Sequence, residues 1–154
     1  MITKSQLQSK VEELVNELKS FKEQLNNFKE FRTIQDAAVG DTLEDGSIVV
    51  KKSDGLALLM APTTTVGYHR WSKEFGDAFA DIETQGFNPT QWFVPTTHQL
   101  QIAMRTVPDE FSSFGHWSSE EYCDMSSKVV SCFGIASLYK SAYKSVRLFR
   151  CVTY

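Results

Sequence analysis

The imidazole groups of this chain are the side chains best suited to acid–base catalysis or metal binding near neutral pH. They belong to His69, His98 and His116, which are separated by 29 and 18 positions in the 154-residue sequence. None forms the closely spaced pairs found in zinc enzymes, and the sequence has no G-x-S-x-G, P-loop or G-x-G-x-x-G motif. The histidines therefore predict no catalytic or metal site.

The cysteines are a second possible source of chemistry. They are Cys123, Cys132 and Cys151. Their odd number and the absence of a C-x-x-C pair argue against a disulfide framework or a zinc site. We expect free thiols that pack as small buried side chains. A single bridge, Cys132–Cys151 or Cys123–Cys132, is the alternative.

A group of carboxylates lies in the second half of the chain. It consists of Asp109, Glu110, Glu120, Glu121 and Asp124. A glycosidase would need two of them on facing walls of a cleft, but acidic side chains in a polar segment more often form a solvated loop, which is what we expect. The sequence thus predicts a protein that is not an enzyme, with no catalytic residue, no metal and no cofactor.

Two aromatic segments are better candidates for binding. Tyr68-His69-Arg70-Trp71 combines rings with positive charge, and residues 111–122 combine rings with serines. Aromatic side chains beside hydroxyl groups suit glycans and protein partners. The predicted ligand-binding residues are Tyr68, His69, Trp71, His116 and Tyr122. The alternative is that these rings fill the core of the domain or a contact between its copies.

The composition sets limits on partners. The chain is 42% hydrophobic and 23% charged with a net charge of −3, which argues against nucleic acid as a partner. No stretch approaches the roughly 20 apolar residues of a membrane span, so we expect no membrane insertion. The first residues, MITKSQLQSKVEELV, lack the apolar region of a secretory signal. We therefore expect synthesis as a soluble product in the cytoplasm.

The elements that would position these groups begin with a regular apolar pattern. It comprises Leu7, Val11, Leu14, Leu18, Phe21, Leu25 and Phe28. The spacings alternate between four and three residues, which is the heptad repeat of a coiled coil. No glycine or proline precedes Gly40. The pattern predicts a coiled-coil stem from about Lys4 to about Arg32.

The residues around this seam favour three strands. Phe21 and Phe28 are bulky for the d positions of a two-stranded coil, and Val15 widens the apolar face at position e. Glu17 at position g and Lys22 at the next e could bridge neighbouring chains. We predict a homotrimer. A dimer, or a helix that folds back onto its own globular domain, is the alternative.

After the stem the pattern changes to that of an α+β domain. Two helices are predicted, at residues 71–83 and 96–107, the second with Thr96 as N-cap and Gln99 completing a capping box. The predicted strands are 47–52, 56–61, 116–119, 128–133, 137–140 and 146–153. They suggest a mainly antiparallel sheet that opens with a β-hairpin. We place the boundary between stem (residues 1–35) and head (residues 36–154) there.

Short motifs in the head resemble one family of bacterial and phage domains. Residues 92–96 (WFVPT) resemble its W-R-L-P-T motif, residues 116–119 (HWSS) its Y-W-S-S motif, and residues 146–150 (VRLFR) its closing V-R-x-V-R strand. The resemblance covers about residues 40–154. The chain departs from the pattern at Phe93 and Val94, where Arg-Leu is usual, and at Gln99, where Glu is usual.

The resemblance implies a C-type-lectin-like or formylglycine-generating-enzyme-like fold, as at the end of a collagen-like adhesin and in tailed-phage proteins. The motifs with which many such lectins bind calcium and sugar are absent. The expected function is a phage virion surface protein, a short fibre, whisker or decoration protein attached to a capsid or tail protein. Its heads would meet a host-surface glycan or protein. The alternatives are an adhesin on the bacterial cell surface and a purely structural trimerisation module.

Overall fold

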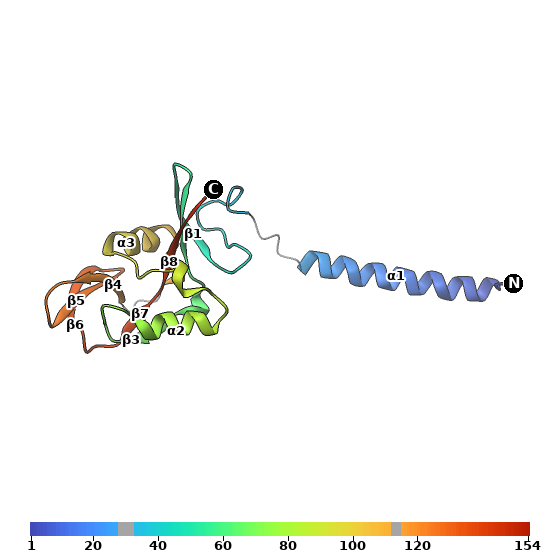
Figure 1. Ribbon diagram of the computed structural model, residues 1–154. Coiled ribbons are helices and arrows are strands. Elements are labelled where there is room, and N and C mark those ends of the chain that lie inside the picture. Colours follow the sequence, from blue (N-terminus) through green and yellow to red (C-terminus); the bar gives the residue numbers. More distant parts are fainter. Residues whose placement is uncertain (28–32, 112–114) are drawn as a thin grey trace. The chain divides into compact units, whose positions relative to one another are not determined.

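The computed structural model describes residues 1–27, 33–111 and 115–154, and the chain divides into two compact units, residues 1–31 and 32–154. In the first unit, residues 1–27 are described and contain one helix, α1 (Lys4–Asn27). The second has an α+β fold built on two sheets (Figure 1). The last part of the predicted stem, residues 28–32, lies outside the described residues.

Helix α1 begins where Thr3 and Gln6 satisfy each other's polar groups. The Thr3 hydroxyl accepts a hydrogen bond from the Gln6 backbone N–H at 3.3 Å, and the Gln6 side chain accepts one from the Thr3 N–H at 2.9 Å. This reciprocal arrangement is a capping box, which stabilises the exposed N–H groups of a first turn. The 24 residues that follow contain no glycine or proline, so the helix continues without interruption.

The second unit contains eight strands among its described residues. They are β1 (Ile48–Ser53), β2 (Leu56–Met60), β3 (Gly67–His69), β4 (His116–Glu121), β5 (Ser126–Ser131), β6 (Gly134–Tyr139), β7 (Lys144–Val146) and β8 (Phe149–Thr153). One sheet has the order β1-β2-β8 and the other β3-β7-β4-β5-β6. All the neighbouring strands are antiparallel except β4 and β7, which are parallel. The predicted α+β fold with a mainly antiparallel sheet is confirmed.

Two helices pack on opposite faces of the larger sheet. Helix α2 (Gly76–Thr84) contributes Ala78 and Ile82 to an apolar cluster that includes Val129 of β5. Helix α3 (Thr97–Thr106) contributes Leu100 and Ala103 to a second cluster that includes the next residue, Val130. Because successive residues of a strand point to opposite faces, β5 joins both clusters.

The opening hairpin and helix α3 form as predicted. Asp54 and Gly55 both have positive φ, 51° and 77°, as a tight turn between twisted antiparallel strands requires. At α3, the Thr96 side chain accepts a hydrogen bond from the Gln99 N–H at 3.2 Å, and Gln99 accepts one from the Thr96 N–H at 2.9 Å. These elements are determined by residues close together in sequence.

The predicted start of the first head helix is wrong. The apolar spacing suggested residues 71–83, but α2 begins at Gly76, after Phe75 in a left-handed conformation (φ 46°). Trp71 lies before it and donates its backbone N–H to the carbonyl of Lys140. Trp71 and Phe75 are nevertheless buried in the cluster beneath α2, which explains why their spacing resembled one helical face.

The predicted last strand, 146–153, is two strands. β7 ends at Val146 in the larger sheet and β8 begins at Phe149 in the smaller one. Residues 145–149 are all buried, so the expected alternation of faces does not hold there. A chain that passes from one sheet to another is enclosed on both sides, and this removes the period-2 signal.

The tryptophans at 92 and 117 lie in the core of the head. Trp92 is 5% exposed and Trp117 is fully buried. The Trp117 ring nitrogen donates to the carbonyl of His69 at 2.8 Å, which ties β4 to β3. The large rings therefore hold the elements of the head together.

Candidate functional site

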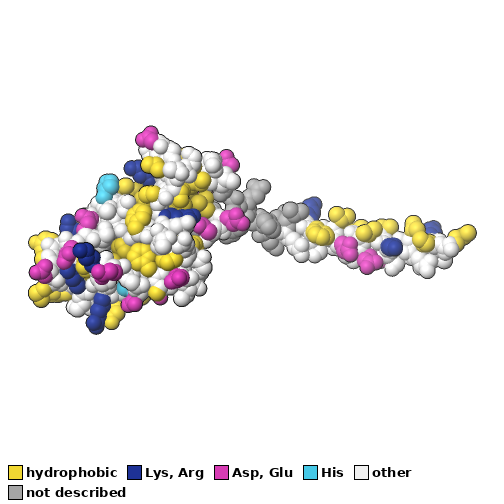
Figure 2. Space-filling view, viewed as in Figure 1, with side chains coloured by type: hydrophobic (Ala, Val, Ile, Leu, Met, Phe, Trp, Pro, Cys, Tyr) yellow, Lys and Arg dark blue, Asp and Glu magenta, His cyan; other side chains and the backbone are white. Residues whose placement is uncertain are grey.

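The largest uncovered apolar feature of the first unit is the stripe along α1. It consists of Leu7 (57% exposed), Val11 (53%), Leu14 (55%), Leu18 (68%) and Phe21 (63%). Figure 2 shows hydrophobic side chains gathered along one side of this helix. Of the other predicted seam residues, Leu25 belongs to α1 but its side chain is outside the described features, and Phe28 is outside the described residues.

The stripe includes a shallow groove of about 470 Å³ lined by Val15, Leu18, Lys19, Phe21 and Lys22. Val15 is 45% exposed and widens the apolar surface on one side. A helix in water normally covers such a surface against another element. The stripe is therefore the principal candidate site for association.

Charged residues flank the stripe on its two sides. Glu17 and Lys22 are both exposed. Residues five positions apart on one helix do not face each other, whereas those three or four apart do. An ion pair between Glu17 and Lys22 is therefore suited to two different copies of the helix.

Two of the five predicted ligand-binding residues are buried, which corrects that interpretation. Trp71 is 8% exposed, and its ring nitrogen donates to the carbonyl of Ser118 at 2.9 Å. His116 is 2% exposed, and its ring packs edge-on against Phe111 with 5.1 Å between ring centroids. Their apolar surface is consumed by the core of the head, so neither offers a contact to an outside ligand.

The remaining three occupy different positions. Tyr68 is 62% exposed on strand β3, and Tyr122 is 65% exposed just after β4. His69 is largely covered, and its Nε2 lies 3.0 Å from the Asp81 carboxylate of α2. Tyr68 and Tyr122 are thus the two predicted residues that offer rings to solvent.

Sequence reasoning missed several exposed rings. They are Phe133 (91% exposed), Tyr139 (66%) and Tyr143 (59%). Arg70 lies over the Tyr143 ring, 5.0 Å from its centroid. Phe133 and Tyr139 lie in the predicted strands 128–133 and 137–140, but the sequence did not predict which side chains of those strands face solvent.

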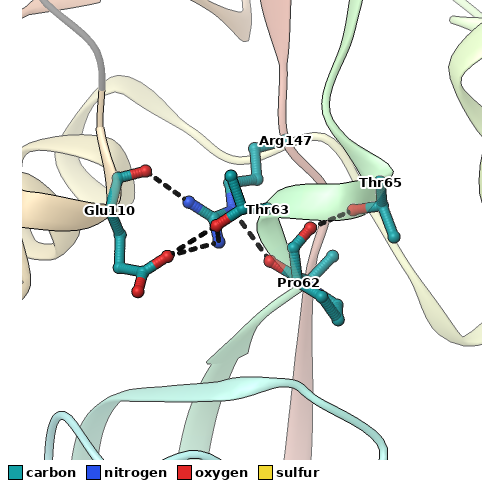
Figure 3. Close-up of polar contacts among 6 residues, drawn as sticks. Pro62, Thr63, Thr65, Glu110 and Arg147 are labelled. Carbon is teal, nitrogen blue, oxygen red and sulfur yellow. Dashed lines mark hydrogen bonds and ion pairs between the residues drawn. The ribbon is translucent and has the colours of Figure 1, made fainter.

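Buried Arg147 connects three segments of the head (Figure 3). Its Nε donates to the Ala61 carbonyl at 2.8 Å, and its Nη1 donates to the Glu110 carbonyl at 2.6 Å. Its Nη2 lies 3.1 Å from a Glu110 carboxylate oxygen, and Thr63 donates to the same oxygen at 2.7 Å. All of these partners belong to the protein itself, which indicates a structural role for this arginine.

The same cluster sets the protonation of Glu110. Partial burial alone would raise the pKa of this carboxyl, but the hydrogen bond from Thr63 and the guanidinium of Arg147 outweigh it. The pKa of Glu110 is therefore below its ordinary value. A carboxylate held ionised by a structural partner is poorly suited to donate a proton.

The prediction that the acidic residues form a solvated loop is wrong in part. Glu120 is on strand β4 and accepts a hydrogen bond from the Thr97 backbone N–H at 2.6 Å, at the start of α3. Hydrogen bonding from Thr97 lowers the pKa of Glu120. Glu121 forms an ion pair with Lys140. These carboxylates anchor neighbouring elements.

The expectation that the cysteines are buried is also wrong. All three are free and exposed. Cys123 and Cys132 lie in the turns before and after β5, and Cys151 lies on β8. A hydrogen bond with Ser126, 3.0 Å away, is the main cause of a lowered pKa at Cys123.

A groove of about 440 Å³ lies beside the smaller sheet of the head. It is lined by Ile34, Leu43, Glu44, Asp45, Leu59, Arg150 and Val152. The ion pair between Arg150 and Asp45, at 2.7 Å, lies at this groove. Much of its apolar lining belongs to a core cluster of the head, so we interpret the groove as a part of that core that the chain does not fully cover.

Residues 1–27, 33–111 and 115–154 contain no group of three or more His, Cys, Asp or Glu side chains placed to hold a metal ion. In the same part of the chain, no helix has the length and apolar character to cross a membrane. Neither a scan against protein-family models nor a search of curated proteins finds a match for this chain.

Proposed function

We propose that this protein is a non-enzymatic surface component of a bacteriophage virion, in which a three-stranded coiled coil presents lectin-like heads. The observation that carries the proposal is the exposed apolar stripe of α1, with five described residues each more than half exposed. Its alternating spacing of four and three fits knobs-into-holes packing between identical helices. The expected partners are two further copies and a capsid or tail protein.

The lectin-like character of the head is part of this proposal. The α+β fold with two short sheets and two helices agrees with it, and so do the buried tryptophans of the WFVPT and HWSS motifs. The exposed rings of Tyr68 and Tyr122 are then the residues that contact a host-surface glycan or protein. Rings of this kind supply contact area at a low entropic cost.

The first experiment is mass spectrometry of purified phage particles from cells that produce this chain. The chain should be present at a constant ratio to the capsid protein after washing in high salt. Its absence from the particles, together with display on uninfected bacteria, would refute the virion assignment and favour the adhesin alternative.

Binding by the heads is tested separately with a glycan array and the intact oligomer. Tyr122→Ala and Tyr68→Ala should weaken any reproducible signal, whereas Glu83→Ala, an exposed residue of α2, serves as a control. Near-ultraviolet circular dichroism establishes that each variant remains folded.

A purely structural trimerisation module is the second candidate. It is favoured by the burial of Trp71 and His116, which removes two rings from the possible binding surface. Under this alternative, a properly folded oligomer shows no glycan or host-surface binding, while the chain remains necessary for particle assembly or stability.

A further inference from the structure

Strand β6 forms one edge of the larger sheet and is open to solvent. It pairs with β5 on one side, and among the described residues no strand pairs with its other side. Its residues Ile135 (46% exposed) and Tyr139 (66%) project apolar surface, and Phe133 in the preceding turn is 91% exposed. Figure 2 shows hydrophobic side chains at the margin of the head where Figure 1 places β5 and β6.

The unused backbone groups of this edge follow from its register. Lys140 donates its backbone N–H to the Met125 carbonyl at 3.0 Å. Leu138 and Ala136 lie two and four residues earlier, opposite Ser127 and Val129, so their backbone groups also point toward β5. In an antiparallel pair the alternate residues turn their N–H and C=O groups the other way. The backbone N–H and C=O groups of Ile135, Ser137 and Tyr139 therefore face the open edge of the sheet. The Tyr139 carbonyl also accepts a hydrogen bond from the backbone N–H of Ala142.

The other sheet edges carry features that block pairing. Strand β1 carries Lys51 and Lys52, and its Ile48 forms a β-bridge with Thr42. Strand β8 forms a β-bridge with Phe93, and β3 is three residues long. Charge, coverage and shortness are the usual protections of an edge strand. β6 has six residues and contains no charge and no proline. The sequence of β6 therefore has none of the features that block pairing with another strand.

We propose that β6 pairs edge to edge with β6 of a second copy of this chain, in antiparallel orientation about Ser137. In this register Ser137 lies opposite Ser137 of the second copy, and Ile135 lies opposite Tyr139. Each outward N–H then meets an outward carbonyl. The strand is thus complementary to itself, and no charged side chain is brought opposite another.

The side chains agree with this register. Ile135, Ser137 and Tyr139 share one face of the strand because alternate residues point the same way. Ile135 and Tyr139 make a β-branched–aromatic pair across the junction, which is a favourable combination between antiparallel strands. The Tyr139 ring of each copy loses exposed surface when the two strands pair.

This pairing goes beyond the stem-based assembly and does not depend on it. A two-fold contact is not an operation of three-fold symmetry. If the stem is three-stranded, the β6 contact joins heads that belong to different stems, and the protein can then form larger assemblies or an array on a surface.

The test compares full-length protein with Ser137→Lys by sedimentation equilibrium. Lysines at this position would face each other across the two-fold axis, so the mass at high concentration should fall at least two-fold, to the mass of the stem-linked oligomer. Ser141→Lys adds the same charge at an exposed position just beyond β6 and should keep the wild-type mass. Equal masses for wild type and Ser137→Lys, or an equal loss in both lysine variants, would overturn the proposal.

Hydrogen exchange provides a second measurement that is independent of mass. The amides of Ile135, Ser137 and Tyr139 should be protected in concentrated wild-type protein and should exchange faster on dilution. Fast exchange at every concentration contradicts the pairing. The stem variant Leu14→Ala separates the two proposals, because it should dissociate the stem and leave the concentration-dependent protection of β6 intact.

Discussion

Replacing Leu14 by alanine should weaken the association of this chain without weakening its helix. Leu14 lies in the middle of the apolar stripe of α1 and is 55% exposed in the single chain. Alanine has the highest intrinsic helix propensity, so the substitution leaves α1 as stable as before or more so. A loss of association can then be attributed to the missing apolar surface.

The size of the effect follows from the exposed fraction. Leucine to alanine removes three carbon groups, worth about 0.8 kcal/mol each when fully buried, or about 2.4 kcal/mol. Since 55% of the residue is available to be newly covered, the loss is about 1.3 kcal/mol per chain. Three chains lose about 4 kcal/mol, which corresponds to roughly a 1,000-fold weaker association constant for the trimer.

Sedimentation equilibrium over a wide concentration range measures this constant. Glu23→Ala is the matched control, because it also shortens a long exposed side chain to alanine but lies at heptad position f, away from the seam. Its association constant should stay within a few-fold of the wild type. A monomeric wild type, or equal effects of Leu14→Ala and Glu23→Ala, would refute the interpretation of the stripe as a coiled-coil seam.

Three further outcomes test the head. Arg147→Leu should lower the free energy of unfolding by about 3–5 kcal/mol in urea titrations, because two carbonyls and the Glu110 carboxylate lose their donor. The control Arg70→Leu, at an exposed position, should have little effect on this free energy. Because the pKa values of Glu110 and Glu120 are lowered on folding, both stabilise the head at neutral pH and lose this contribution as the pH falls below the ordinary glutamate range. Glu110→Gln with Glu120→Gln should flatten that acid dependence, and an unchanged slope would contradict it. All three thiols should react with a water-soluble disulfide reagent in the folded protein. Thiols that react only after denaturation would contradict their exposed positions.

The elements that sequence predicted well are those whose cause is local. The capping box of α3 joins Thr96 to Gln99, and the first hairpin depends on Asp54-Gly55. In both cases the deciding contacts lie within three residues along the chain. Such signals keep their meaning whatever the rest of the molecule does.

The elements that were missed depend on distant contacts. The change of sheet between β7 and β8 occurs at Arg147, whose partners Ala61 and Glu110 are 86 and 37 positions away. No pattern within residues 144–153 encodes those partners. Cys132 is exposed because it lies in the turn between β5 and β6, whereas the sequence placed it inside the predicted strand 128–133.

The candidate binding site differs from the predicted one because burial of a ring depends on distant contacts. Aromatic residues indicated binding by their type, but type does not distinguish a ring that packs inward from one that faces solvent. Trp71 and His116 proved to be core residues, while Tyr68 and Tyr122 remain exposed. Separating the two groups required the position of each strand within the sheet, which the sequence did not provide.

A contact that uses the two exposed rings Tyr68 and Tyr122 should be weak on each single head, and this makes the stem important to the proposed function. Linked copies convert later binding events into intramolecular ones, which can raise overall affinity by about 10²–10⁴ without any new contact. Loss of the stem through Leu14→Ala should therefore reduce attachment to a multivalent surface far more than binding to a soluble monovalent ligand. Tyr122→Ala should instead reduce both, because it acts on the contact itself. Equal losses for Leu14→Ala in the two assays would mean that the heads do not act together.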